Sequence, residues 1–275
     1  MIPGAFEYHR PESVSEAAGL LAQLGEEARV LAGGHSLIPM MKLRMAVPEH
    51  LVDLQDIAEL REISVSNGQV SIGAMVTQDR LINDAALLDA APIIREAALQ
   101  IADPQVRYVG TIGGNVANGD PGNDMPGLMQ CLDAQFEVTG PNGSRSIAAR
   151  DFYESAYFTA RSDEEILTRI SFETPANTGY AYEKQKRKIG DYATAAAAVL
   201  VGGGMASVAM TNLSDTPIWS AEAGTALAGG DVDGCVSAMM EAIDPGEDMR
   251  GPVAFKKHVA AVILRRAIER AQSRA

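Results

Sequence analysis

Two short segments of this chain, far apart in the sequence, combine adjacent glycines with polar side chains. They are Ala32-Gly33-Gly34-His35-Ser36 and Thr111-Ile112-Gly113-Gly114-Asn115. Glycine reaches backbone angles that other residues avoid and has no Cβ, so successive N–H groups at such a pair can converge on a phosphate. A turn is the more common role of either segment taken alone. The two segments together predict a two-part clamp for a phosphate-bearing cofactor.

Three further features could contribute to such a site. The polar run Asn118 to Asp124 follows the second glycine segment. Its last residue, Asp124, is a candidate acceptor for ribose or adenosine hydroxyl groups, and a solvated loop with Asx turns is an equal alternative. The basic cluster Lys184 to Lys188 could hold an anion locally. No Ser-His-Asp arrangement surrounds His35, so we expect it to position the loop rather than to catalyse.

Several cofactor motifs are missing from the sequence. It contains no Gly-x-Gly-x-x-Gly fingerprint, no P-loop and no cysteine set for zinc or an iron–sulfur cluster. Cys131 and Cys235 are the only cysteines, and their spacing predicts buried, reduced thiols. A Rossmann dehydrogenase, a nucleoside triphosphatase and a metal site within this chain are therefore disfavoured.

Composition narrows the class of protein further. The 275 residues carry a net charge of −13, which disfavours binding to nucleic acid or to an anionic membrane. Apolar residues make up 47% and aromatic residues 5%, so we expect a core of small aliphatic side chains in packed α/β layers. The first ten residues lack the basic and then apolar pattern of a signal peptide, and no apolar run reaches about 18 residues. We expect a cytoplasmic protein.

The elements that would position the glycine segments fall into three modules, which we place at residues 1–56, 57–177 and 178–275. In the first, Ser13 and Glu16 form a capping box for a helix that ends at Gly25. The expected strands of this module are 28–32 and 50–54. In the second, Asn67-Gly68 predicts a hairpin over 63–72. Further elements expected there are helices at 78–83, 87–102 and 126–132, a hairpin over 136–148, and a strand at 165–172.

The third module contains an ambiguous alanine-rich run, Ala193 to Val201. Alanine favours a helix, but the run ends in Gly202-Gly203-Gly204 and resumes with small residues at 206–210. We therefore predict two strands of a hairpin, preceded by a strand at 180–182. A helix is expected at 254–271, with Val259, Val262, Ile263 and Ala267 as its apolar stripe.

The two glycine segments resemble the FAD-pyrophosphate motifs of the flavin subunits of molybdenum hydroxylases. Within that family, four other segments resemble the medium subunits of aerobic carbon monoxide dehydrogenases. These segments are Ile2-Pro3-Gly4, Tyr8-His9-Arg10-Pro11, Gly119-Asp120-Pro121-Gly122-Asn123-Asp124-Met125-Pro126 and Lys186-Arg187-Lys188-Ile189-Gly190-Asp191-Tyr192-Ala193-Thr194. The resemblance extends over the whole chain.

The resemblance implies an α+β fold. It would consist of a two-lobed FAD-binding domain of the vanillyl-alcohol oxidase type and a C-terminal three-stranded antiparallel sheet with helices. The glycine segments would bind the pyrophosphate, and Asp124 would meet the ribose side. Ile101 and Leu167 would pack near the flavin or adenine, Lys184 or Lys188 would lie near the isoalloxazine, and Tyr192 would lie beside the flavin ring. The implied FAD-binding residues are Leu31, Ala32, Gly33, Gly34, His35, Ser36, Leu37, Ile101, Thr111, Ile112, Gly113, Gly114, Asn115, Asp120, Asp124, Leu167, Lys184, Lys188 and Tyr192.

The resemblance also implies a function in electron transfer, without any catalytic acid or base in this chain. Carbon monoxide and water would be converted to carbon dioxide at a molybdenum–copper centre in a large partner subunit. Electrons would pass through [2Fe–2S] clusters of a small partner subunit to this FAD, and then to a quinone-type acceptor. The complex would be a dimer of heterotrimers, in the cytoplasm or bound peripherally to the inner face of the membrane.

Three alternatives remain open from the sequence. The chain could be the FAD subunit of another molybdenum hydroxylase, one that oxidises an aldehyde or an N-heterocycle. It could be a self-contained flavin oxidase, which is disfavoured because no His or Cys stands in a flavin-attachment setting and the chain is short. It could also be a non-enzymatic scaffold whose glycine segments are only turns.

Overall fold

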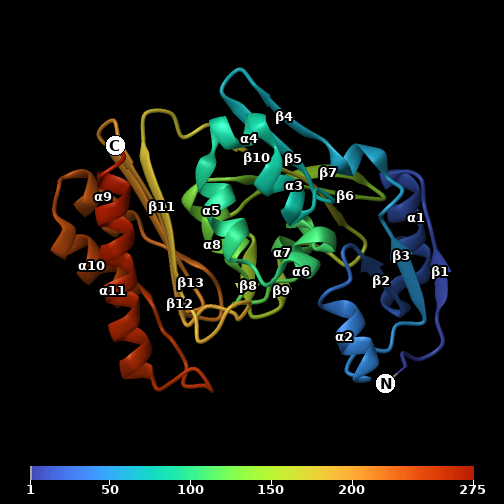
Figure 1. The fold of residues 1–275 in the computed structure, drawn as a ribbon. Helices are drawn as coiled ribbons and strands as arrows, with labels where there is room; N and C mark the ends of the chain where they lie inside the picture. The colour runs from blue at the N-terminus through green and yellow to red at the C-terminus, as the bar shows by residue number, and fades with distance from the viewer. Residues whose placement is uncertain (1) are drawn as a thin grey trace.

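The computed structural model describes residues 2–275 and contains three main sheets that follow one another along the chain (Figure 1). The N-terminal lobe has a parallel sheet in the order β1-β3-β2. Its strands are β1 (Glu7–His9), β2 (Ala28–Leu31) and β3 (His50–Asp53). Its helices are α1 (Val14–Leu24), α2 (Leu37–Lys42) and the 3₁₀ turn η1 (Gly25–Glu27).

Helix α1 confirms the predicted helix and its end. The Ser13 side chain accepts a hydrogen bond from the N–H of Glu16, and Gly25 has a φ of 58° with its N–H bonded to the carbonyl of Leu21. The carboxylate of Glu16 caps the N–H of Glu12 rather than that of Ser13, so the capping box is only half formed.

The central module is built on an antiparallel sheet in the order β4-β5-β10-β6-β7. These strands are β4 (Ile63–Ser66), β5 (Gln69–Gly73), β6 (Gln135–Gly140), β7 (Gly143–Ala148) and β10 (Ile166–Glu173). Both predicted hairpins are present, and the first turns at Asn67 and Gly68 with φ of 51° and 74°. A small ribbon consists of β8 (Tyr153–Ser155) and β9 (Phe158–Thr159), and η2 (Ala58–Arg61) leads into β4.

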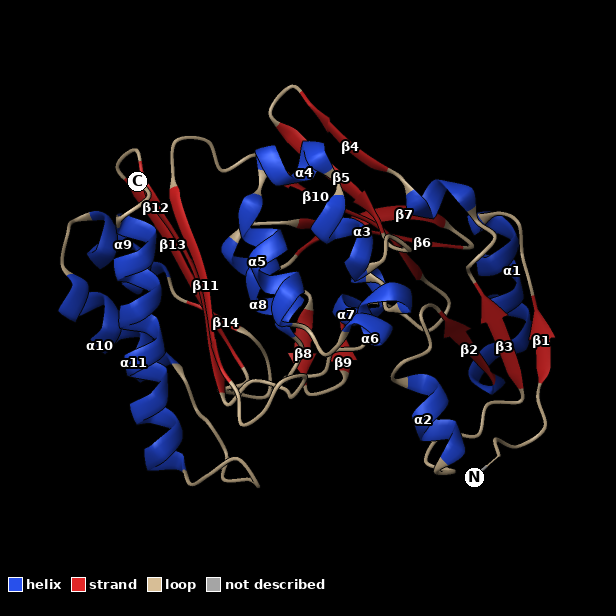
Figure 2. Cartoon of the chain, viewed as in Figure 1, coloured by secondary structure: helices blue, strands red, loops and turns tan. Residues whose placement is uncertain are grey.

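The helices of the central module are α3 (Gln78–Asn83), α4 (Ala85–Ala90), α5 (Pro92–Gln100), α6 (Pro104–Val109), α7 (Ile112–Ala117) and α8 (Asp124–Cys131). Of these, α5 and α8 pack against the C-terminal sheet (Figure 2). The prediction of one helix over 87–102 was wrong, because the chain breaks at Ala91 (φ −149°, ψ 67°). The residue before a proline avoids the α region, while Pro92 itself fits the first position of a new helix.

The C-terminal module is an antiparallel sheet in the order β11-β12-β13-β14, covered by three helices. The strands are β11 (Gly179–Gln185), β12 (Ala195–Gly202), β13 (Met205–Thr211) and the two-residue edge strand β14 (Ile218–Trp219), which adds to the three that were expected. The helices are α9 (Ala221–Ala228), α10 (Val232–Ala242) and α11 (Val253–Gln272).

The alanine-rich run is a strand, as predicted, because both of its faces are buried. Ala195 and Ala197 belong to the core shared with α11, whereas Ala196 and Ala198 belong to the core of the central module. Alternation along a strand places successive side chains on opposite faces, so small residues let helices pack closely on both sides. The C-terminal sheet is therefore fixed to the central module.

This two-sided packing predicts a cost for any larger side chain in β12. We expect Ala197→Leu to lower the free energy of unfolding by about 1–3 kcal/mol, because Ala197 has no exposed surface and overpacking forces its neighbours to move. Ala22→Leu, at an exposed position of α1, is the matched control and should change stability little. Urea unfolding measures both variants, and equal effects would contradict the two-sided packing.

Candidate functional site

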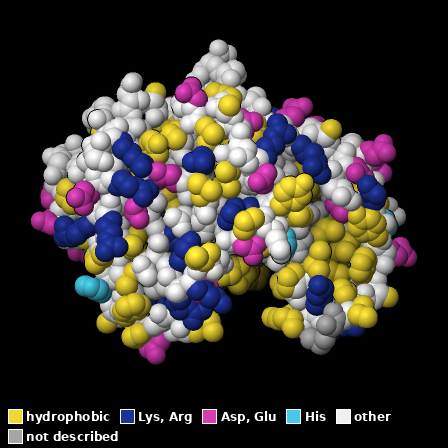
Figure 3. All heavy atoms as spheres, viewed as in Figure 1, with side chains coloured by type: hydrophobic (Ala, Val, Ile, Leu, Met, Phe, Trp, Pro, Cys, Tyr) yellow, Lys and Arg dark blue, Asp and Glu magenta, His cyan; other side chains and the backbone are white. Residues whose placement is uncertain are grey.

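A cleft of about 670 Å³ lies where the N-terminal lobe, the central helices and the start of the C-terminal sheet meet. Its volume falls within the range of small-molecule and cofactor sites. Figure 3 shows the hollow beside the N-terminal lobe, with apolar side chains on the face of the lobe that borders it. Of the nineteen residues implied by the family resemblance, all but Leu31, Ile112, Asp120 and Lys188 line this cleft.

The first glycine segment joins β2 to α2 and packs directly against backbone of the central module. A Cβ on Gly33 would lie 2.8 Å from Cα of Gly110 and still closer to the carbonyl oxygen of Val109. Gly34 has a φ of 73°, a conformation that glycine adopts without strain. Within residues 2–275, the N–H groups of Gly33 to Ser36 donate no backbone hydrogen bond. They are available to an anion in the cleft.

The second glycine segment forms the first turn of α7, and not the open stretch of free N–H groups that the predicted clamp requires. Its N–H groups already have partners inside the chain: Ile112 donates to the carbonyl of Val76 (2.9 Å), Gly113 to that of Ala74 (2.9 Å) and Gly114 to the Thr111 hydroxyl (3.0 Å). A Cβ on Gly113 would lie 2.5 Å from Cβ of Ala74, and one on Gly114 would lie 3.3 Å from Cβ of Ala32. The second segment therefore offers a close-fitting surface, while the first offers free donors.

Asp124 forms a buried ion pair at the cleft wall. Its Oδ2 lies 2.7 Å from Nζ of Lys184, and the two side chains are 5% and 1% exposed. Its Oδ1 accepts a hydrogen bond of 2.6 Å from the Tyr182 hydroxyl. Tyr182 and Lys184 share one face of β11 because they are two residues apart. Burial, with the charge of Asp124, raises the pKa of Tyr182 well above its ordinary value, so this phenol stays neutral.

The two candidate lysines have different surroundings. Lys184 lines the cleft, and its ammonium group also donates to the carbonyl of Gln100 at 3.2 Å. Lys188 is exposed and does not line the cleft. Both oxygens of Asp124 already have protein partners, so the carboxylate is less available to a ribose hydroxyl than the sequence indicates.

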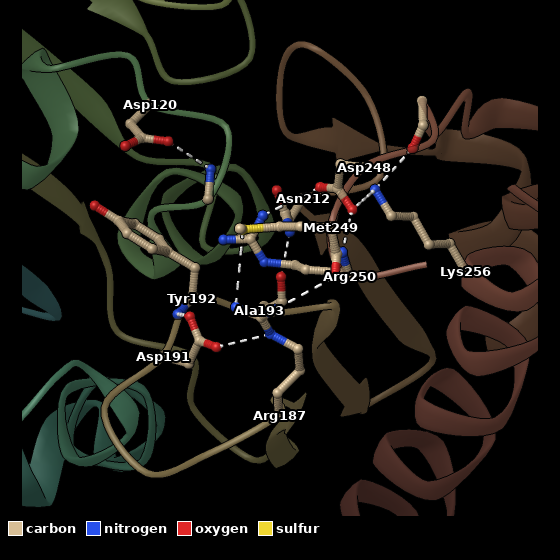
Figure 4. Close-up of polar contacts among 12 residues, drawn as sticks. Asp120, Arg187, Asp191, Tyr192, Ala193, Asn212, Asp248, Met249, Arg250 and Lys256 are labelled. Carbon is tan, nitrogen blue, oxygen red and sulfur yellow. Dashed lines mark hydrogen bonds and ion pairs between the residues drawn. The ribbon is translucent and has the colours of Figure 1, made fainter. Parts of the chain in front are cut away.

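Tyr192 lines the cleft, is 42% exposed, and lies in the loop between β11 and β12, next to Asp191 (Figure 4). Its ring packs on Gly122, where a Cβ would lie 2.6 Å from Cδ1 of Tyr192. Burial and then the Asp120 carboxylate raise the pKa of Tyr192 to about 12, so it is a neutral phenol at physiological pH. The loop is held by Asp191, whose carboxylate pairs with Arg187 (3.0 Å) and accepts from the N–H of Tyr192 (2.9 Å).

The structure also brings residues to the cleft that the sequence did not single out. Among these are Met75, Gln78 and Arg161. Arg161 donates to the carbonyls of Ser162 and Glu165 at 2.6 and 2.7 Å. Ile101 and Leu167 are buried and line the cleft. Nothing in the local sequence separates Gln78 from an ordinary surface residue at a helix start.

The residues present fit a dinucleotide such as FAD. The first glycine segment supplies donors for a phosphate, and the glycines leave space that a Cβ would occupy. The buried amide of Gln78 faces the cleft with no protein partner within residues 2–275. Apolar lining residues such as Ile101, Ile166 and Leu167 suit planar rings.

Comparison with known proteins defines the class. The sequence model described as "FAD binding domain in molybdopterin dehydrogenase" matches residues 4–175, and "CO dehydrogenase flavoprotein C-terminal domain" matches residues 180–271. The chain belongs to this family of FAD-binding flavoproteins of molybdopterin dehydrogenases.

Similar proteins narrow the class. The chain is 57% identical to the carbon monoxide dehydrogenase medium chain of Afipia carboxidovorans, over 100% of this chain and 99% of that one. It is 44% identical to the carbon monoxide dehydrogenase medium chain of Hydrogenophaga pseudoflava, with the same coverage. A solved structure of Cu,Mo-CO dehydrogenase in a cyanide-inactivated form superimposes with a TM-score of 0.96, at 56% identity and full coverage of both chains.

The buried ion pair predicts a strong dependence of stability on Lys184. We expect Lys184→Met to lower the free energy of unfolding by about 3–5 kcal/mol, because Asp124 would be left charged and buried without its partner. The double variant Lys184→Met with Asp124→Asn should be more stable than the single one, because the buried charge is removed. Denaturant unfolding of wild type, Lys184→Met, Asp124→Asn and the double variant tests this, and additive effects of the two single variants would contradict the coupling.

Proposed function

We propose that this chain is the FAD-binding medium subunit of an aerobic carbon monoxide dehydrogenase. It would relay electrons from iron–sulfur clusters of a partner subunit to an external, quinone-type acceptor, while carbon monoxide and water are converted to carbon dioxide elsewhere in the complex. The observation that carries the proposal is the cleft bordered by both glycine segments, in a chain similar over its full length to carbon monoxide dehydrogenase medium chains.

We assign the roles in the cleft as follows. The free N–H groups of the first segment bind the pyrophosphate, and the second segment lets it approach closely. Ile101 and Leu167 pack near the flavin or adenine ring. Lys184, rather than Lys188, lies near the isoalloxazine, and Tyr192 lies beside the flavin ring. The arrangement of the three sheets supports the division into 1–56, 57–177 and 178–275.

In this role the protein binds and orients, and FAD supplies electron transfer when bound. Lys184 and Tyr192 line the cleft, and the neutral phenol of Tyr182 supports Asp124 from behind it through a hydrogen bond. No side chain of this chain is assigned as a catalytic acid or base.

We propose that the partners are a large molybdenum-containing subunit and a small iron–sulfur subunit, assembled as a dimer of heterotrimers in the cytoplasm. Exposed apolar side chains support an assembly, because contiguous ones often mark protein interfaces. They cluster in and after α2 and include Ile38, Met40, Leu43, Met45 and Val47. Within residues 2–275, no helix is both long and apolar enough to cross a bilayer.

A second candidate is the FAD subunit of a molybdenum hydroxylase that acts on an aldehyde or an N-heterocycle. The cleft of this chain would serve that enzyme equally well, because the substrate is bound in the partner. A self-contained flavin oxidase is less well supported: both cysteines are buried, and neither lines the cleft.

The phosphate-binding role of the first segment can be tested at Ser36, the N-cap of α2. Its side chain makes no capping hydrogen bond, and aspartate is a favoured N-cap residue, so Ser36→Asp should fold normally. The added negative charge should weaken FAD binding about ten-fold or more, because it repels the pyrophosphate. Flavin content of the purified complex is the measurement. Ser36→Asn, without the charge, should retain the flavin, and equal flavin in all three proteins would refute the assignment.

Purification from the native host tests the role in the complex. A tagged chain should bring down a large molybdenum-containing subunit and a small subunit with iron–sulfur clusters, and the complex should reduce a quinone analogue when carbon monoxide is supplied. Oxidation of an aldehyde or an N-heterocycle, without carbon monoxide oxidation, would establish the second candidate. Recovery of the chain alone, with no flavin, would favour a scaffold.

A further inference from the structure

Gln78 is a buried polar residue that the fold itself does not use. It is the first residue of α3, is 2% exposed, and lines the cleft. Neither Nε2 nor Oε1 of its side chain has a hydrogen-bond partner in the described chain, residues 2–275. Buried side-chain amides are nearly always hydrogen-bonded, so a pair of unsatisfied atoms on one amide needs an explanation.

The fold around Gln78 does not depend on its side chain. Thr77 caps α3 through its hydroxyl, which accepts from the N–H of Arg80, so the helix does not need the Gln78 side chain. The backbone N–H of Gln78 donates to the carbonyl of Gly110 at 2.9 Å, immediately before the second glycine segment. This bond fixes the residue beside the site, with its amide at the cleft wall.

A second buried glutamine, Gln130, differs from Gln78 in its hydrogen bonding and in its position relative to the cleft. Gln130, in α8, is 4% exposed and donates through Nε2 to the carbonyl of Ala149 at 3.4 Å. It does not line the cleft, and only its Oε1 is unsatisfied among the described residues. Gln78 therefore combines two unsatisfied atoms with access to a cavity, which is the arrangement expected of a ligand contact.

We propose that the carboxamide of Gln78 binds the FAD through both its donor and its acceptor, and so fixes the position of the cofactor next to the second glycine segment. This inference rests on the proposed function. Phosphate oxygens only accept hydrogen bonds, so they would satisfy Nε2 but not Oε1. The partner is therefore a part of FAD that offers a donor beside an acceptor, namely sugar or ribityl hydroxyls or the edge of a ring system.

The test replaces Gln78 with methionine in the assembled complex, which is stripped of flavin and then reconstituted. Methionine has a similar length and no polar atom to satisfy. The stripped Gln78→Met complex should unfold at the same temperature as wild type or higher, because an unpaired buried amide has been removed. Its dissociation constant for FAD, from titration of flavin fluorescence, should rise about ten-fold. A residue that only stabilised the fold would lower the unfolding temperature when replaced. A residue that contacts the ligand weakens FAD binding without that loss.

Two further variants complete the experiment. Gln23→Met, on the exposed face of α1, should leave both quantities unchanged. Gln78→Glu keeps the shape, removes the donor and adds a negative charge, so it should bind FAD more weakly than Gln78→Met. Competition by ADP and by FMN identifies the half of FAD that is recognised, because only one of them should compete less well in Gln78→Met than in wild type.

The outcomes distinguish this inference from the proposed function. If wild type takes up FAD and both Gln78 variants bind it equally well, the amide is satisfied by water and the inference is overturned while the function stands. If the wild-type complex takes up no FAD, the proposed function fails and the inference fails with it. Weaker FAD binding together with unchanged stability of the stripped complex supports the inference.

Discussion

The N-terminal lobe meets the central module through backbone, at positions where a side chain has no room. Gly33 lies against Val109 and Gly110, and Gly114 faces Ala32. Because no Cβ keeps these segments apart, two stretches of chain that are far apart in sequence come into direct contact. The width and position of the cleft follow from this contact. Beside this contact, the N–H groups of the first segment donate no hydrogen bond to a strand or helix of the described chain.

The other wall of the cleft depends on the C-terminal sheet being held firmly. Alanines on both faces of β12 let it pack between α11 and the central module. From the neighbouring strand, β11, Lys184 and Tyr182 reach Asp124 at the start of α8. A buried ion pair of this kind contributes little net stability compared with apolar residues of similar volume, but it tolerates few alternative arrangements. It fixes the direction in which β11 faces the cleft.

The sequence predicts most of this fold, because its signals are local. Ser13, Thr77 and Asn67-Gly68 each satisfy or shape nearby backbone, and the structure has a helix start or a hairpin at each of them. The break at Ala91 is also local, since Pro92 alone explains it, and the predicted continuous helix underestimated that effect. The alanine run is a strand because of tertiary burial, which overrides helix propensity.

The site is less predictable, because its polar groups are defined by what surrounds them. Residues within the glycine segments were found from their types, yet the sequence does not reveal that the N–H groups of Ile112, Gly113 and Gly114 are already bonded. Nor does it reveal which residue Asp124 pairs with, since Lys184 lies 60 positions away. Gln78 carries no signal at all, because burial of an amide beside a cavity is a property of the folded chain.

The groups that line the cleft, and the buried Tyr182 behind Asp124, are suited to holding a cofactor rather than to exchanging protons with it. Burial keeps the phenols of Tyr182 and Tyr192 neutral, and the charge of Asp124 is balanced by Lys184. Fixed donors and neutral phenols in a partly closed site change little when charge on a bound group changes, so the protein contributes a preorganised electrostatic environment. A flavin that relays electrons needs the same electrostatic environment in its oxidised and its reduced state. It also needs access for the partners that deliver and remove electrons, and Tyr192, a lining residue of the cleft, is 42% exposed.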